Sequence, residues 1–156
     1  MDLPEGVTLR GYLPGDFEAM FRLDEVCFEP EFRFSKLSMR RFAEAKRARV
    51  GVAVAGESLA GFAITHIERA PTGSAGYVVT LDVAPAWRRR GLAQALMSQA
   101  ETVAREAGCG ALLLHVYVGN EGAIRFYEWL GFERGHTVEA FYGDGLDAMV
   151  YRKRLG

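Results

Sequence analysis

The sequence predicts a single α/β domain with a mixed β-sheet. Segments with the apolar pattern of strands alternate with segments of helical periodicity along the whole chain. The chain has 156 residues, 49% of them hydrophobic, which is enough for one compact domain with a substantial core and too little for two ordinary domains. We therefore expect residues 1–156 to form one domain, with a sheet of about seven strands and flanking helices.

A strand and two helices are expected first. Residues 7–13 form the strand, and Pro14-Gly15-Asp16 then begins a helix. The apolar residues of this helix have helical spacing: Phe17, Met20, Phe21 and Leu23. Residues 28–34 interrupt the helix, and Ser35 is a typical N-cap for a second helix that extends to about residue 48.

A hairpin is expected after the second helix. Residues 50–55 and 58–68 have strand character and are joined by Gly56-Glu57, a typical short turn. Residues 70–76 are expected to form a loop, and an apolar strand then covers residues 77–84.

The second half of the chain continues the alternation. The expected elements are a helix at 91–107, a strand at 111–118, a helix at 120–130, and strands at 132–140 and 146–155. Gly108 and Gly110 are expected to end the first of these helices, and Gly131 the second.

The strand at 111–118 contains an unusual polar residue. Between Leu112 and Val118 this strand is apolar on both faces, which predicts a central strand covered on each side. His115 is the exception, and it shares a face with Leu113 and Tyr117. Taken alone, His115 fits a core histidine that is hydrogen-bonded to the backbone.

Composition excludes several classes of function. A net charge of −1 gives no overall attraction to nucleic acid or to an acidic membrane surface. No basic segment followed by an apolar stretch opens the chain, and no apolar run is long enough to span a bilayer, so we expect a cytoplasmic protein. Cys27 and Cys109 lack the spacing of metal ligands. We expect both to be buried packing residues and expect no metal site.

One segment is locally basic. Its positive side chains are Arg33, Lys36, Arg40, Arg41, Lys46, Arg47 and Arg49. A helix that binds nucleic acid or the ribosome would have this pattern, but so would the solvated face of a helix that packs through Leu37, Phe42 and Ala45. We favour the solvated face.

The turn from Arg88 to Ala93 is the most informative local feature. It joins an apolar strand to an alanine-rich helix, so the unpaired amides and the dipole of the helix N-terminus would suit an anion. Gly91 and Ala93 lack bulk where a ligand must approach the backbone. Neither a P-loop nor the three-glycine dinucleotide motif is present, so the turn predicts a pyrophosphate cofactor of another type.

Two motifs together resemble the GNAT superfamily of acetyl-CoA-dependent N-acetyltransferases. They are Arg88-x-x-Gly91-x-Ala93 and, one helix and one strand later, Asn120-x-x-Ala123-x-x-x-Tyr127-x-x-x-Gly131-Phe132. The second motif is the more specific, and the resemblance covers the chain from about Val50 to its end.

Within the superfamily, the sequence is most similar to protein N-terminal acetyltransferases, including those for ribosomal-protein alanine. Phe141-Tyr142-Gly143-Asp144-Gly145-Leu146-Asp147-Ala148 resembles the segment that helps to hold the peptide N-terminus in those enzymes. Many ribosomal-protein enzymes have a glutamate in place of His115. A branch that acts on peptides starting with methionine has a histidine there and a tyrosine matching Tyr77.

The resemblance implies that acetyl-CoA lies between the strands at 77–84 and 111–118, which splay apart, and that CoA is the product. Backbone donors near Leu81 and Val83 would pair with the pantetheine arm and polarise the thioester carbonyl. Asn120 would contact a pantetheine amide or act only as a helix N-cap. The expected cofactor-binding residues are Leu81, Asp82, Val83, Arg88, Arg89, Arg90, Gly91, Leu92, Ala93, Asn120, Ala123, Phe126 and Tyr127.

The resemblance also implies an acceptor site and catalytic residues. The expected acceptor-binding residues are Phe28, Phe32, Val79, Phe141 and Tyr142. Deprotonating a peptide α-amine at neutral pH costs about 1 kcal/mol, against about 5 kcal/mol for a lysine, so a weak base suffices for an N-terminus. His115 fits that base, directly or through a water, with Tyr77 completing the relay.

Tyr127 is the candidate general acid, because the reference pKa of a phenol lies close to that of a thiol. Asp82 is a weaker candidate base, because strand alternation turns its side chain away from Leu81 and Val83. Without the motif, Tyr77 and Tyr127 would be interpreted as packing residues. Neither cysteine has the setting of an activated nucleophile, so we expect direct attack by the amine in a ternary complex.

Other acceptors keep the same fold. A polyamine, amino acid, antibiotic or lysine side chain would also suit a GNAT enzyme, and Glu29 and Glu31 are acidic residues that a polycation could use. A CoA-binding regulatory module without activity is a third possibility, disfavoured by the presence of Tyr127 and His115. We expect a monomer or a homodimer.

Overall fold

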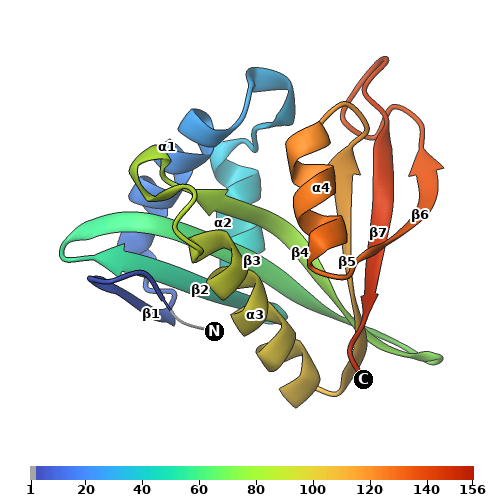
Figure 1. Ribbon diagram of the computed structural model, residues 1–156, viewed down its shortest axis with the longest axis horizontal. Coiled ribbons are helices and arrows are strands. Elements are labelled where there is room, and N and C mark those ends of the chain that lie inside the picture. The colour runs from blue at the N-terminus through green and yellow to red at the C-terminus, as the bar shows by residue number, and fades with distance from the viewer. Residues whose placement is uncertain (1–2) are drawn as a thin grey trace.

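The computed structural model describes residues 3–156, and within that range the chain forms one mixed seven-stranded sheet with helices on both faces (Figure 1). The strand order is β1-β2-β3-β4-β5-β7-β6, and every neighbouring pair is antiparallel except β4 and β5. The strands are β1 (Val7–Gly11), β2 (Ala48–Ala55), β3 (Ser58–Ala70), β4 (Gly73–Val83), β5 (Cys109–Tyr117), β6 (Glu133–Val138) and β7 (Ala148–Arg154). This α/β architecture confirms the predicted fold class.

Four α-helices and three short 3-10 turns occur in the part of the chain that the structure describes. The helices are α1 (Phe17–Cys27), α2 (Lys36–Glu44), α3 (Leu92–Glu106) and α4 (Glu121–Trp129). The 3-10 turns are η1 (Pro14–Asp16), η2 (Pro30–Phe32) and η3 (Pro85–Trp87). None of the helices within residues 3–156 has the length and apolar character of a membrane-spanning helix.

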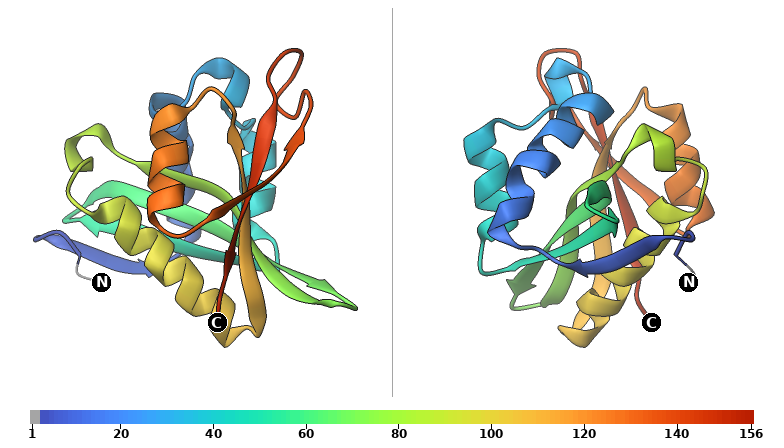
Figure 2. Two further views of the ribbon diagram at one scale, coloured as in Figure 1. Left: turned by 45° about the vertical axis from the view of Figure 1, so that its right-hand side comes forward. Right: turned by 90° about the vertical axis from the view of Figure 1, so that its left-hand side faces the viewer.

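The helices divide between the two faces of the sheet. Phe17 and Met20 of α1 and Met39 of α2 pack with Phe62 and Ile64 of β3, so these two helices cover one face. Met97 and Ala100 of α3 pack with Leu112 and Leu114 of β5 on the other face, where residues of α4 also lie against this core. The right-hand view of Figure 2 shows the two pairs of helices on opposite sides of the sheet.

Local capping signals identified several boundaries correctly. The Ser35 hydroxyl accepts a hydrogen bond from the Ser38 amide at 3.1 Å and caps α2. Gly108 and Gly131 have φ angles of +85° and +97°, the left-handed conformation expected where a helix ends. Gly110 does not end a helix: Gly108 already terminates α3, and Gly110 lies inside β5.

Two predicted boundaries were wrong because strand pairing overrides local propensity. The second helix ends at Glu44 rather than near residue 48, since Ala48 already pairs with His66 across β2 and β3. The predicted loop at 70–76 is instead a β3–β4 hairpin, in which Ala70 pairs with Gly73. Small and polar residues there are held in strands by the ladder, and the hairpin projects beyond the sheet in Figure 1.

The two faces of β5 are not equally covered, contrary to expectation. Leu112, Leu114 and Val116 are buried against α3 and α4. His115 and Tyr117, on the opposite face with Leu113, are only half-buried. The core formed by α1 and α2 is built on β2, β3 and part of β4, so loops rather than helices approach this face of β5.

The parallel strands β4 and β5 pair only over a short stretch. Their register runs from Ser74 opposite Cys109 to Tyr77 opposite Leu113, and no pairing follows beyond Tyr77 within the described residues. Figure 1 shows the two strands diverging from this point. A gap therefore opens in the middle of the sheet.

The backbone of β4 turns free groups toward this gap. The Ala84 amide donates to the Ala60 carbonyl. Because hydrogen-bonded residues alternate along an antiparallel pair, the register predicts that the amides of Asp82 and Thr80 also point toward β3. The amides of Leu81 and Val83 consequently point away from β3, toward the space between β4 and β5. This orientation is the one expected for donors to a bound thioester.

Gly61 provides the first testable prediction, because α3 packs closely over it. A β-carbon added at Gly61 would lie 2.7 Å from the Asp82 carbonyl oxygen and 3.3 Å from both Leu92 and Leu96. We expect Gly61→Ala to lower the free energy of unfolding by about 1–3 kcal/mol, measured by urea denaturation. Gly11→Ala is the matched control, since nothing lies within 4 Å of its added carbon. Equal effects of the two substitutions would contradict this account of the packing.

Candidate active site

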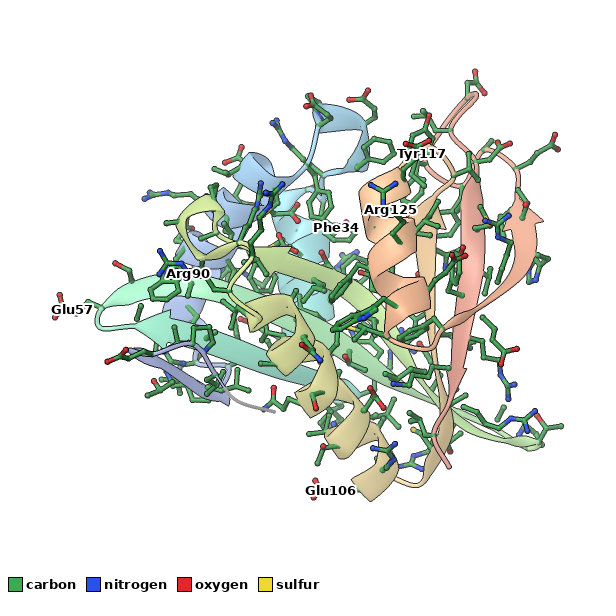
Figure 3. The ribbon with its side chains drawn as sticks, in the orientation of Figure 1. Phe34, Glu57, Arg90, Glu106, Tyr117 and Arg125 are labelled. Atoms are coloured by element: carbon green, nitrogen blue, oxygen red, sulfur yellow. The ribbon has the colours of Figure 1, made fainter. Side chains whose placement is uncertain are left out.

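A cavity of about 300 Å³ lies where the turn before α3 faces α4. Arg89 and Gly91 both have positive φ angles, of 61° and 83°, and their turn leads into the N-terminus of α3, whose first amides have no partner within the helix. Figure 3 shows Arg90 at this turn. The cavity is lined by Val83, Trp87, Arg88, Arg89, Gly91, Leu92, Ala93, Gln94, Phe126 and Trp129. A helix N-terminus beside an apolar wall suits a ligand with an anionic group and a long uncharged arm.

Two arginine side chains of the turn are used within the protein. Arg88 donates from Nε to the Val83 carbonyl at 3.1 Å and from Nη2 to the Cys27 sulfur at 3.6 Å. The Arg90 guanidinium lies 4.9 Å from the centre of the Trp87 ring. We therefore expect the turn to hold a pyrophosphate mainly through backbone amides rather than through these two side chains.

Sequence reasoning missed part of this cavity. Trp87, Gln94 and Trp129 line it and were not predicted. Trp129 follows Phe126 by three residues, and their rings are 6.5 Å apart, so helical spacing from the predicted Phe126 could have identified it. The Asn120 side chain accepts a hydrogen bond from the Ala123 amide at 3.1 Å, so the structure shows the N-cap alternative for Asn120.

Asp82 is a correction to the predicted cofactor-binding set. Its amide bonds toward β3, as the register requires, and its side chain is completely buried on the side of α1. Asp82 therefore contributes neither group to the gap between β4 and β5. Leu81 and Val83, its neighbours, do face that gap.

Tyr77 and His115 form a hydrogen-bonded pair at the start of the gap. The Tyr77 hydroxyl lies 2.8 Å from Nδ1 of His115. They meet because Tyr77 pairs with Leu113 in the parallel register and His115 is the next residue on the same face of β5. The Phe141 ring stacks on His115 with centroids 4.1 Å apart and an angle of 4° between the rings. The imidazole is thus held from two sides.

The protonation of this pair follows from its surroundings. Burial lowers the pKa of His115, and the nearby His136 lowers it further. Burial raises the pKa of Tyr77 to about 12, with a smaller contribution from Glu68. At neutral pH the imidazole is therefore neutral and able to accept a proton, while the phenol keeps its own.

The core-histidine interpretation applies to a different histidine. His66 is buried, and its Nε2 lies 2.8 Å from the Phe42 carbonyl oxygen, a bond to the backbone within the core. His115 is instead half-buried, and the partner of its Nδ1 is a side chain. The two environments distinguish a structural histidine from a candidate base.

Four aromatic residues from separate parts of the chain gather beside His115. We call Phe32, Tyr117, Phe141 and Tyr142 the aromatic cluster. The Phe32 ring lies 5.0 Å from Tyr117 and 5.1 Å from Tyr142, and Phe141 lies 4.9 Å from Tyr142. Tyr117, labelled in Figure 3, was missed as a site residue, although strand alternation had placed it on the face of His115.

Two predicted acceptor-binding residues lie outside the aromatic cluster. Phe28 follows α1 as its C-cap residue, and the structure records no ring contact for it among the described residues. Val79 packs against the hydrophobic core beneath α1 and α2. Packing therefore accounts for the Val79 side chain, whereas Phe32, Phe141 and Tyr142 lie together in the aromatic cluster.

The segment between β6 and β7 is held by its own hydrogen bonds. The Asp147 carboxylate accepts from the Ala140 amide at 2.9 Å, and the Tyr142 amide donates to the Leu146 carbonyl at 3.1 Å. These bonds fix the Phe141-Tyr142 pair against β5. Asp147 acts as a loop support in this arrangement.

Tyr127 lies on α4 and packs against the core that α3 forms with β5. Its ring lies 5.3 Å from Phe126 and 5.7 Å from Phe132. Although part of the residue is exposed, burial raises its pKa, and Asp82 and Tyr142 raise it further. The pKa of Tyr127 is therefore further from that of a thiol than the reference values indicated. We expect its hydroxyl to stabilise a departing thiolate by donating a hydrogen bond.

Among residues 3–156, no group of three or more His, Cys, Asp or Glu side chains is arranged to hold a metal ion. Cys109 is buried, as expected, but Cys27 is only half-buried, and its thiol donates to the Val83 carbonyl at 3.4 Å. Burial raises the pKa of both thiols. Neither has the depressed pKa of a nucleophilic cysteine.

Comparison with known proteins identifies the family. The model of the acetyltransferase (GNAT) family matches residues 17–132. The chain therefore belongs to the GNAT acetyltransferase family.

Two curated relatives of this chain have names that indicate different acceptors. N-alpha-acetyltransferase MAK3 of Arabidopsis thaliana is 37% identical over 73 residues, which is 47% of this chain and 38% of the relative. Mycothiol acetyltransferase of Paenarthrobacter aurescens is 31% identical over 153 residues, covering 90% of this chain and 46% of the relative. The chain thus spans about half, or less, of the length of these relatives.

Solved structures share the whole fold. Arabidopsis thaliana NAA60 in complex with a bisubstrate analogue has a TM-score of 0.83 at 23% identity, covering 95% of this chain and 97% of that one. The ribosomal-protein-S18-alanine N-acetyltransferase of Escherichia coli has a TM-score of 0.83 at 22% identity, covering 96% and 94%. A structure of NAA60 with acetyl-CoA has a TM-score of 0.84 at 22% identity, covering 96% and 98%. At these identities the likeness establishes the fold alone.

Tyr127→Phe tests the proposed donor to the leaving thiolate. Loss of the hydroxyl should lower kcat by about a hundredfold or more and leave the affinity for acetyl-CoA nearly unchanged. Steady-state kinetics and calorimetric titration with acetyl-CoA would measure the two effects. Tyr12→Phe is the control, because Tyr12 bonds to Glu44 away from this site. An unchanged kcat in Tyr127→Phe would remove Tyr127 from this role.

The pH dependence of kcat/KM tests His115. Because burial lowers its pKa below the ordinary value of 6.5, the base form is lost only as pH falls through that lowered pKa. With an α-amine acceptor, a plot of log kcat/KM against pH should steepen there from a slope of about one to about two. His115→Ala should remove the steep limb and most of the activity. Full activity of His115→Ala on a peptide would exclude an essential base at this position.

Proposed function

We propose that this domain transfers the acetyl group of acetyl-CoA to the α-amine of a protein or peptide N-terminus. The observation that carries the proposal is the position of the aromatic cluster around the Tyr77–His115 pair. Apolar rings suit the first side chain of a peptide, and a neutral histidine beside them suits removal of a proton from its α-amine.

The strength of the base agrees with this acceptor. An α-amine is mostly protonated at pH 7, but removing its proton costs only about 1 kcal/mol, so a neutral imidazole is a sufficient base. A lysine acceptor would require about 5 kcal/mol, and the described site contains no ionised carboxylate in contact with His115 that would strengthen the base. The proposed relay runs from the amine, directly or through a water, to His115, with Tyr77 bonded to it.

The geometry favours direct attack in a ternary complex. The aromatic cluster lies on the face of β5 opposite the core packed against α3 and α4, whereas the cofactor cavity lies between the start of α3 and α4. The gap between β4 and β5 joins the two sides. An amine on one side and a thioester carbonyl held by the Leu81 and Val83 amides could then react in the gap.

A small-molecule amine is the second candidate acceptor. The mycothiol acetyltransferases match most of this chain at 31–35% identity, whereas the N-alpha-acetyltransferases match about half of it. Glu29 and Glu31 are exposed beside Phe32 and could attract a cationic acceptor. These two observations favour testing small amines together with peptides.

The ion pairs of the basic segment, residues 33–49, support a solvated helix face rather than a surface that binds nucleic acid. Lys36 pairs with Glu18, Arg40 with Glu44 and Arg47 with Glu68, each at 3.3 Å. Arg40 also lies 4.0 Å from the centre of the Phe17 ring. These positive charges are thus matched by acidic or aromatic neighbours of the same domain.

Release of CoA thiol from acetyl-CoA tests the proposed acceptor. The panel contains peptides with free N-termini, the same peptides with blocked α-amines and free lysines, and small polyamines. We expect turnover with free N-termini only, and the preferred first residue would report on the pocket formed by the aromatic cluster. Turnover confined to small amines would overturn the peptide acceptor, while the cofactor site and the proposed role of Tyr127 would stand.

A further inference from the structure

Two carboxyl groups are buried in contact with each other beneath the acceptor side of the sheet. Asp24 of α1 is 1% exposed and Asp82 of β4 is 0% exposed. Their side chains are within hydrogen-bonding reach of each other. Among residues 3–156, Asp24 Oδ1 and Asp82 Oδ2 are the buried side-chain oxygens without another donor.

Two ionised carboxylates cannot bond to each other, because each offers only acceptors and both carry negative charge. A proton held between the two carboxyl groups gives the hydrogen bond a donor and removes one of the two charges. The same environment explains why no other donor is needed at Asp24 Oδ1 and Asp82 Oδ2. Bulk solvent does not supply a donor to these oxygens, since both residues are almost completely buried.

The remaining oxygens connect the pair to two functional segments. Asp82 Oδ1 accepts a bond of 2.6 Å from the Thr80 hydroxyl, on the strand whose Leu81 and Val83 amides face the cofactor gap. Asp24 Oδ2 accepts a bond of 3.3 Å from the amide of Phe34, which is labelled in Figure 3. Phe34 is two residues beyond Phe32 of the aromatic cluster.

Burial and the neighbouring charged residues shift the pKa values of Asp24 and Asp82. Burial is the main cause that raises the pKa of both Asp24 and Asp82, and their mutual repulsion raises that of Asp82 further. Glu25 acts on Asp24 in the same direction. Arg33 opposes the shift at Asp24, and Arg88 opposes it at Asp82. Cys27 and Tyr127 lie close enough for Asp82 to raise the pKa of each.

We infer that Asp24 and Asp82 share one proton, and that this pair is a positioning device that holds the acceptor segment, residues 28–35, against the cofactor strand β4. The pair does not touch the reacting groups. It sets the distance between Phe32, which we place at the acceptor, and the Leu81 and Val83 amides, which we place at the thioester. The part of this inference that concerns acceptor binding rests on the proposed function, whereas the shared proton does not.

The inference has a definite pH dependence. Because the pKa of Asp82 is raised in the folded protein, the folded state holds a proton that the unfolded state has lost above the ordinary aspartate range. Stability contributed by the pair is therefore lost as pH rises through the raised pKa. An asparagine at either position can donate its amide hydrogen to the remaining carboxylate, so the contact is kept with no proton left to lose.

Infrared spectroscopy of the folded protein tests the shared proton directly. We expect the wild type at neutral pH to show the carbonyl stretch of a buried protonated carboxyl group, which disappears on alkalinisation. Asp82→Asn and Asp24→Asn should each lack this band and should each show a smaller fall of Tm with rising pH. Glu25→Gln is the matched control, since Glu25 is an exposed neighbour of Asp24 and should keep the band. Absence of the band from the wild type, or its survival in both asparagine variants, would overturn the shared proton.

Kinetics tests the positioning role with the acceptor that the panel identifies. Asp82→Ala leaves the Asp24 carboxyl without its partner and should raise KM for that acceptor by about tenfold, with KM for acetyl-CoA changed much less. In the wild type, the acceptor KM should rise at alkaline pH, where the shared proton is lost. Asp82→Asn should have the wild-type acceptor KM at neutral pH and should not show this alkaline rise. Equal changes in the KM values for the acceptor and for acetyl-CoA would overturn the positioning role of the pair, as would an acceptor KM that Asp82→Asn does not restore. The shared proton is tested separately by the infrared band, and the acceptor by the panel of amines.

Discussion

The divergence of β4 and β5 is the constraint on which the rest of the structure depends. These neighbouring parallel strands pair only as far as Tyr77, and beyond that residue their facing edges are no longer paired with each other. Backbone groups in the middle of a sheet normally require partners, so a gap of this kind is stable only where a ligand or side chains occupy it. The amides of Leu81 and Val83 face into the gap, which explains how a thioester could be held at the centre of the domain.

The helices make the two ends of this gap different. On one side α3 begins at a turn with left-handed residues and, with α4, borders the cavity in which we place the cofactor. On the other side, the core of α1 and α2 ends before β5, and aromatic side chains from distant loops cover its exposed face. Gly61 permits the close packing of α3 on the sheet that places the turn beside β4. Under the proposed function, the same sheet would separate cofactor from acceptor and let them meet at one point.

Burial determines the protonation of the polar groups near the gap. Tyr77 and Tyr127 keep their protons and His115 remains neutral, so the site holds two hydrogen-bond donors and one proton acceptor at the same pH. The Asp24–Asp82 pair lies deeper and follows the same rule, since two carboxyl groups removed from water retain a proton between them. Proton placement in this domain is therefore a consequence of packing more than of the intrinsic acidity of each side chain.

The sequence by itself determined the features that depend on near neighbours. Caps at Ser35 and Asn120, the helix ends at Gly108 and Gly131, and the turn at Gly91 are local conformations, and the order of elements with their motifs predicted the family fold. The Tyr77–His115 and Phe141-Tyr142 groups were identified by resemblance to known motifs. Contacts between distant segments could not be predicted in this way. The meeting of Phe32 with Tyr117, the burial of Asp24 against Asp82 and the incomplete covering of β5 depend on how helices of particular lengths pack on a splayed sheet. Only the tertiary structure decided these features, because the energy of such contacts depends on relative positions that no local pattern specifies.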